Sequence, residues 1–419
     1  MSDNNSIEPG GYIVKKCELT NYDGTKKIVI GDMITNIEIQ EDISKVSIHG
    51  LLTIEDATNI IDSFPLLGEE QLVLEIEDFF KQTTTYNFHI YAVDTLVTNN
   101  TGTAQFYVMR MFSKDYIKSE SVEISFSYRG RISEMVKTVY DEYFISRKPI
   151  EIEDTVGEAV IVVPNLTPIE TLMMLATKSF SDVYKSSNFL FFERKDKYFF
   201  GTHEKLFEDG RLTEKKYYYS SVNADIEDRA EQMNKIQNFS LNKRFNLIEE
   251  MRKGASISRV IKLDLATKTY ENIDYKHYEK VKEYKHTDSV QQKYHTTKFN
   301  EEFFGDENIT NKYLVFQDSA ILDQAYQPYA DILSQRLSTA YYLNSILMYV
   351  DFYGANNMNV GDLIRLDLQE LSSANDYVKP HKTLSGLYMV ANLKSVYDGS
   401  KWKMTAGLLK DALKGEGAL

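Results

Sequence analysis

The 419-residue sequence has a single cysteine, Cys17, and no long apolar run. One cysteine excludes a disulfide within the chain and a zinc site built from several cysteines, and burial as a small apolar residue is its expected use. No stretch of about 18 uninterrupted apolar residues could span a bilayer, and the polar start carries no secretory signal. We therefore expect folding in a reducing cytoplasm, without membrane insertion.

Basic side chains are also fewer than acidic ones. The chain has 48 Lys and Arg and 62 Asp and Glu, which gives a formal net charge of −14. An acidic surface repels phosphate groups, which disfavours a dedicated nucleic-acid-binding protein.

Tryptophan occurs once, whereas 29 Tyr and 22 Phe give a high aromatic content. Such side chains bury large areas, which suits a strand-rich protein with extensive subunit contacts.

Motifs of common enzymes and metal sites are missing as well, among them Gly-x-Ser-x-Gly, His-Glu-x-x-His and the phosphate-binding and calcium loops. His277, His286 and His295 recur every nine residues, a spacing that gives no common side of a helix, so a solvated polar segment is favoured over a zinc site. The pair His203-Glu204 is interpreted as two polar residues on the surface. We expect no catalytic residue, cofactor or metal, and hence no enzyme.

Alternating apolar residues predict strands at both ends of the chain. After a polar start at 1–11, interpreted as a flexible arm, the period-two pattern runs from 12 to 113. It returns at 216–275 and 338–414, where Asp398-Gly399 predicts a hairpin turn. The apolar positions of the first strands include Ile34, Ile37, Ile39, Val46, Ile48, Leu52, Ile54, Leu72, Leu74 and Ile76.

Helical signals lie between these two β regions, at 114–215. Thr167, Pro168 and Glu170 form a capping box. The helix that it starts should bury Ile169, Leu172, Met173, Ala176 and Phe180, and an earlier helix should bury Ile132, Met135, Val136, Val139, Tyr140 and Tyr143. Residues 276–337 are predicted to be an insertion, with a polar excursion to about 316 and then a long helix, Ile321 to Leu337, that Pro328 should kink or divide.

Several segments, in chain order, resemble the baseplate central hub proteins of contractile-tailed bacteriophages, the tail hub or tube-adaptor family. They are the Ile-Thr-x-Ile-x-Ile-x-Glu-Asp strand at 34–42, the run from Val162 through Thr167-Pro168-Ile169-Glu170 to Ala176, and the closing strands from Gly361-Asp362 to Lys410-Asp411-Ala412. The resemblance is weakest at 276–316. It implies an α+β, mainly β fold, with two tube-like antiparallel β-barrel domains (12–113, and 216–275 with 338–414), an inserted α/β domain (114–215) and the further polar and helical insertion (276–337).

The resemblance also implies a structural function. Three chains with two tube-like domains each would form a homotrimer that adapts the sixfold tail tube to the threefold cell-puncturing spike and forms part of the DNA ejection channel. Implied partners are the tail tube protein, the spike, baseplate wedge proteins and passing DNA without specific binding. The chain stops soon after its last strand, so the spike is expected on a separate polypeptide. The location would be the virion tail baseplate, after assembly in the host cytoplasm.

Glu38 is the residue that we assign to the channel. The polar positions Glu38, Gln40, Glu55 and Glu75 alternate with apolar ones and must point away from the core. Since tube domains of the resembled family line the channel with sheet faces, Glu38 is expected in the lumen, in a wall of carboxylates that repels DNA. Two alternatives stay open: the equivalent hub of a non-contractile tail or phage-like injection particle, and a tail-associated glycan hydrolase, which would need an extra domain.

Overall fold

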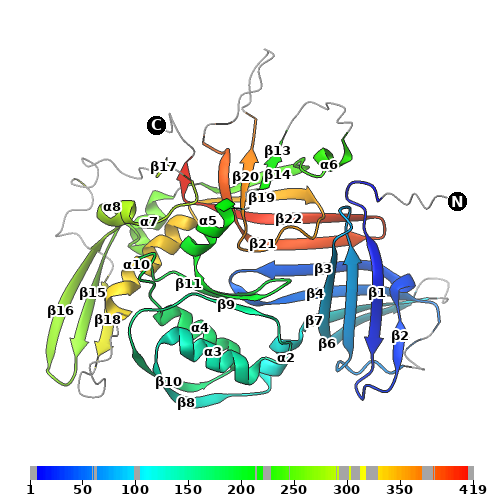
Figure 1. Ribbon diagram of the computed structural model, residues 1–419, viewed down its shortest axis with the longest axis horizontal. Coiled ribbons are helices and arrows are strands. Elements are labelled where there is room, and N and C mark those ends of the chain that lie inside the picture. The colour runs from blue at the N-terminus through cyan, green and yellow to red at the C-terminus, as the bar shows by residue number, and fades with distance from the viewer. Residues whose placement is uncertain are drawn as a thin grey trace, which may run out of the picture.

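The computed structural model of the chain is dominated by β-sheet (Figure 1). It describes residues 7–58, 60, 64–98, 104–212, 215–219, 228–244, 246–288, 290–291, 302, 312–317, 329–369, 381 and 383–413. Within these ranges a 13-stranded sheet runs along the molecule, and smaller sheets and helices cover it, which confirms the predicted α+β, mainly β class. None of the described helices is long and apolar enough to cross a membrane.

The large sheet has the hydrogen-bonded order β14-β19-β22-β21-β3-β4-β7-β6-β5-β1-β2, with β20 paired to β21 and β13 to β20. Strands from the two ends of the chain meet where β3 pairs with β21, with Glu38 opposite Val396. This order has two ends, at β14 and β2, so closure of either barrel stays a prediction. The strands are β1 Ile13–Thr20, β2 Lys27–Val29, β3 Ile34–Asp42, β4 Lys45–Asp56, β5 Gln71–Glu77, β6 Thr83–Thr98, β7 Gln105–Ser113, β13 Lys215–Tyr218, β14 Asn238–Arg244, β19 Ile346–Tyr353, β20 Leu363–Asp367, β21 Gly386–Asp398 and β22 Lys401–Lys410.

One continuous core lies under this sheet and confirms the period-two pattern. Ile37 and Leu52 from the first strands pack in the same cluster as Tyr397 and Trp402 from the last ones. The predicted hairpin joins β21 to β22, with Gly399 at a positive φ of 63°. Gly354 is required beside the Trp402 ring, because a Cβ at this position would lie 1.9 Å from it.

The middle of the chain forms an α/β unit below the sheet in Figure 1. Its elements are α2 Lys114–Glu120, β8 Ile124–Gly130, α3 Ile132–Tyr143, β9 Ile150–Ile152, β10 Ala159–Leu166, α4 Pro168–Lys178, β11 Phe189–Glu193, β12 Tyr198–Thr202 and α5 His203–Leu212. The capping box at Thr167 is confirmed. The predicted buried face was wrong at Met173, which is 43% exposed, while Leu175 is buried. Phe180 lies beyond the helix end and is half-buried.

The predicted face of α3 is confirmed at five of its positions, and Tyr143 is half-buried. The last residue of β11 and the turn after it connect the α/β unit to the large sheet. Glu193 accepts hydrogen bonds from the Ile48 backbone and from Lys148 Nζ, at 3.0 and 2.6 Å. Lys195 lies 3.5 Å from the buried Glu41 of β3 and donates to the Met358 carbonyl. The α/β unit and the large sheet are therefore joined by buried hydrogen bonds and ion pairs.

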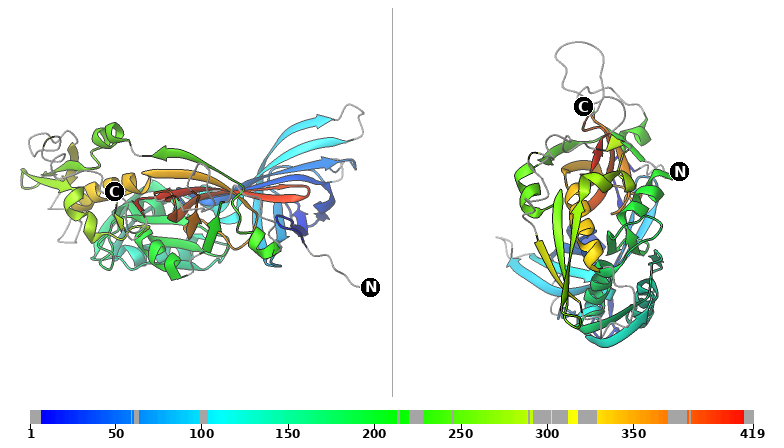
Figure 2. Two further views of the ribbon diagram at one scale, coloured as in Figure 1. Left: turned by 90° about the horizontal axis from the view of Figure 1, so that it is seen from above. Right: turned by 90° about the vertical axis from the view of Figure 1, so that its left-hand side faces the viewer.

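A further group of elements lies at the end of the molecule opposite the first strands, which are drawn in blue (Figure 2). Strands β15 (Ile257–Asp264), β16 (Thr269–Lys276) and β18 (Lys312–Gln317) form a separate sheet of order β16-β15-β18, although β15 and β16 fall in the range expected for the second tube domain. The domain boundaries therefore stay a prediction. The short elements are η1 Gly31–Met33, α6 Arg229–Gln232, α7 Leu247–Lys253, α8 His277–Lys280, η2 Val281–Glu283, β17 Val290–Gln291 and β23 Ala412–Leu413.

The long helix of this region is α10, Tyr329–Leu343, which packs on β15. It begins at the residue after Pro328, and the expected first part, from Ile321 to Pro328, lies outside the described residues. Ile332 is buried as predicted, but Leu337 is 42% exposed, so that assignment was wrong.

Candidate functional site

The surface that bears on a hub function is the polar face of the large sheet, where the ends of the chain meet. Residues opposite one another in neighbouring strands share a face, so Glu38 of β3 lies beside Val396 of β21 and Leu51 of β4. Its neighbours Ile37 and Ile39 point the other way and are buried. The same polar face includes Lys394, Gln40, His49, Arg110, Thr405 and Asp351.

Charges at the centre of this polar face are paired. Lys394 Nζ lies 2.8 Å from Glu38 Oε2, and Arg110 pairs with Asp94. Asp351 accepts a hydrogen bond from Thr405 at 2.7 Å. Glu38 is therefore paired with a cation within its own chain, and its place in a channel wall of carboxylates stays a prediction.

Buried carboxylates account for part of the acidic excess of the first β region. The Glu70 carboxylate accepts from the backbone N–H groups of Leu67, Gly68 and Glu69. Asp56 caps the following turn through Thr58 and Ile60. These side chains hold the backbone and do not face solvent, so formal charge overestimates the acidity of the surface.

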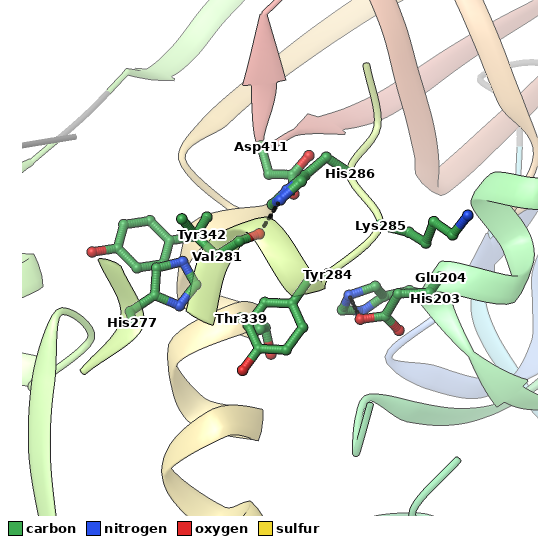
Figure 3. Close-up of a pocket in the computed structure, with 10 residues that line it drawn as sticks. All are labelled: His203, Glu204, His277, Val281, Tyr284, Lys285, His286, Thr339, Tyr342 and Asp411. Atoms are coloured by element: carbon green, nitrogen blue, oxygen red, sulfur yellow. Dashed lines mark hydrogen bonds and ion pairs between the residues drawn. The ribbon is translucent and has the colours of Figure 1, made fainter. Parts of the chain in front are cut away.

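A polar cavity of about 10 Å³ lies where α5, α8, η2, α10 and the end of β22 converge (Figure 3). A space of this size accommodates about one water molecule and is too small for a substrate. It is lined by His203, Glu204, His277, Val281, Tyr284, Lys285, His286, Thr339, Tyr342 and Asp411.

His286 is held as a cation at this cavity. Its Nδ1 lies 2.7 Å from Asp411 Oδ2 and its Nε2 lies 2.8 Å from the Val281 carbonyl oxygen. Both partners are acceptors, so both ring nitrogens must donate. Burial alone would lower the pKa of His286, but the Asp411 charge and these hydrogen bonds raise it overall. Burial opposes ionisation of Asp411 too, yet His286 and Thr287 bring its pKa down to about 2.

His277 is kept neutral beside this cation. Burial and the positive charge of His286 lower the pKa of His277 to about 3. Its ring stacks on Tyr342, with centroids 4.1 Å apart, and its Nδ1 lies 3.2 Å from the Tyr275 hydroxyl. The two histidines thus have opposite protonation states in one network of side chains.

These positions correct two interpretations of the sequence. His203 and Glu204 are buried at the start of α5, with His203 Nε2 3.1 Å from Glu204 Oε1, so they are not the surface residues that the sequence had suggested. His277 and His286 do come together, whereas His295 lies outside the described residues. The described part of the chain holds no cluster of three or more possible metal ligands.

Sequence reasoning missed Lys394 as the partner of Glu38 and Asp411 as the partner of His286. Lys394 sits at an outward position of β21, which alternation could have indicated. Asp411 directly follows the last long strand and pairs with a residue 125 positions earlier, so no local pattern indicates it.

Comparisons with known proteins agree with this architecture. No family model matches the chain. It is 20% identical over 433 residues to the probable baseplate hub protein gp334 of Vibrio phage KVP40, covering 98% of this chain and 97% of that protein.

Two solved structures share the fold. A tail protein from Neisseria meningitidis MC58 superimposes with a TM-score of 0.58 at 9% identity, covering 96% of this chain and 97% of its own. The 43 kDa tail protein of prophage MuSo2 from Shewanella oneidensis gives a TM-score of 0.53 at 11% identity, covering 95% and 98%. The resemblance drawn from the sequence is thereby confirmed: the chain is similar along almost its whole length to a phage baseplate hub protein and has the fold of phage tail proteins.

Proposed function

We propose that this protein is the structural hub of a phage baseplate, a homotrimer that joins the sixfold tail tube to the threefold spike and encloses part of the ejection channel. The full-length similarity to a baseplate hub protein supports this function. Its partners would be the tube protein, the spike, wedge proteins and passing DNA, and its place the virion tail baseplate.

The observation that carries the proposal is the joining of β3 to β21. Strands from both ends of the chain form one sheet, so each chain contributes two adjoining β regions to a wall. Three such chains present six β regions, which is the number needed to match a sixfold tube. Open strand edges favour association, since unpaired backbone groups are satisfied by a neighbouring chain.

We further propose that the polar face with Glu38 lines the channel. The pairing of Glu38 with Lys394 would give a polar wall in which the positive charge of Lys394 is compensated. Phosphate groups then find no strong local attraction, which allows DNA to pass without being retained. In this proposal the wall avoids retaining DNA because its charges are paired, and not because the chain as a whole is acidic.

Electron microscopy of the purified chain, alone and mixed with its tube and spike proteins, tests the proposal. We expect threefold rings with Glu38 in the lumen, stacked between tube and spike. Light scattering gives a second measure, since a trimer of 48.4 kDa chains has a mass of about 145 kDa. A chain that stays monomeric with both partners present, or a ring with Glu38 on its outer wall, contradicts the proposal.

A further inference from the structure

The β16-β15-β18 sheet has one covered and one open face. On the covered face Val260 is buried against α10, and Ser258 Oγ donates to Ser334 Oγ at 2.9 Å. On the open face Leu263 lies opposite Tyr270 on one side and Phe316 on the other. We call this the apolar face; its members are Ile261, Leu263, Tyr270, Leu314 and Phe316, and the exposed Leu265 follows in the turn after β15.

The apolar face is strongly exposed. Tyr270, Leu314 and Phe316 are 70%, 54% and 62% exposed, and Leu265 in the turn after β15 is 60% exposed. Single exposed apolar residues are ordinary on protein surfaces, but a contiguous group with two aromatic rings is typical of a binding surface. One pair of charges beside it is neutralised, since Arg259 Nη2 lies 2.7 Å from Asp274 Oδ2.

The charge of this sheet is opposite to that of the rest of the chain. Residues 257–276 and 312–317 hold five Lys or Arg against three Asp or Glu, a net charge of +2, although the whole chain carries −14. Residues 12–113 hold seven Lys or Arg against fifteen Asp or Glu, a net charge of −8. Without the buried carboxylates of Glu41, Asp56, Glu70 and Asp78, residues 12–113 still hold eleven Asp or Glu against seven Lys or Arg, a net charge of −4. The first β region of another copy of this chain therefore complements this sheet in charge.

The two regions also lie at opposite ends of the molecule, with β15, β16 and β18 at one end and β1 and β2 at the other (Figure 1). The far end offers apolar contact as well, because Val29 on the outermost strand β2 is 74% exposed. We propose that the apolar face of one chain binds the acidic first β region, residues 12–113, of a second copy, head to tail. Such a heterologous contact closes into a ring when the rotation per subunit is 120°.

This contact rests on the proposed trimer and names the surfaces that hold it together. Phe316→Asp and Tyr270→Asp place a carboxylate in the apolar face, where it meets an acidic neighbour. We expect each to weaken assembly at least about tenfold, as for loss of a central aromatic contact. Val183→Asp, at an apolar residue of the α/β unit that is more exposed than either, is the control and should assemble like the parent.

Sedimentation of the four proteins across a concentration series gives the assembly constants, and the fluorescence of Trp402, buried in the core, reports whether each variant is folded. Folded variants that dissociate while the control assembles support the contact. A ring that survives both substitutions overturns the contact and leaves the trimer standing, whereas a monomeric parent overturns both.

Cross-linking identifies the surface that is bound. The native Cys17 is buried, so Tyr270→Cys can carry a photoreactive benzophenone at one site. We expect intermolecular cross-links to residues 12–113, recognised in mixtures of isotopically labelled and unlabelled chains. Cross-links confined to other parts of the chain, or formed only when spike protein is added, overturn the proposed pairing.

Discussion

Single residues determine the charge state of the small cavity, and His286 is the clearest case. Its raised pKa means that the folded protein holds a proton more tightly than the unfolded chain does. The resulting stability is complete below the ordinary histidine pKa near 6.5 and is lost as pH rises through the folded pKa. Asp411→Asn removes the charge that holds this proton and should cost about 1.5 to 3 kcal/mol at pH 6, but less at pH 9. Urea melts at the two pH values measure the difference, and an equal loss at both would contradict the cationic assignment.

Helix α4 provides a test at the scale of an element. Loss of the cap in Thr167→Ala should reduce the unfolding free energy by about 1 kcal/mol, and Leu172→Ala, at a fully buried position, by about 2 to 5 kcal/mol. Met173→Ala, one residue along but exposed, is the control and should change it by less than about 0.5 kcal/mol. Denaturant melts of the three variants decide; equal losses at 172 and 173 would mean that the helix presents another face to the core.

The attachment of the α/β unit to the large sheet is a property of the whole molecule. Glu41 is buried, and burial raises its pKa while Lys195 opposes the rise. Lys195→Met leaves that carboxylate without its cation and should cost about 3 to 5 kcal/mol. The loss should be smaller at pH 5 than at pH 8, because a protonated Glu41 needs no counterion.

Trp402 fluorescence, which reports the sheet core, and far-ultraviolet circular dichroism, which follows the helices as well, should shift together in Lys195→Met if the two parts unfold as one. The double variant Glu41→Gln with Lys195→Met is the control and should recover part of the loss. A single variant as stable as the parent at pH 8 would show that this ion pair does not hold the parts together.

Patterns of neighbouring residues predicted much of this fold. Alternation placed Ile37 and Leu52 in the core, and the capping box at Thr167 placed the start of α4. Four consecutive apolar residues, 172–175, left the helix face ambiguous, because neighbours on a helix differ by about 100° and hydrophobicity does not choose between them.

The cavity could not be predicted in this way, because its members come from segments far apart in the sequence. His203 and Asp411 are more than 200 residues apart, and only tertiary contacts bring them to one place. A local signal existed for His203-Glu204 alone, which directly follows the buried strand Tyr198–Thr202.

The pairing of β3 with β21 also sets an order of events on the ribosome. Val396 follows its neighbour Glu38 by 358 positions in the sequence (396 − 38). At typical elongation rates this stretch takes roughly 20 to 70 s to synthesise. Throughout that time the nascent chain carries a strand edge whose partner does not yet exist. A truncated translation product would keep this edge permanently and could pair with another chain.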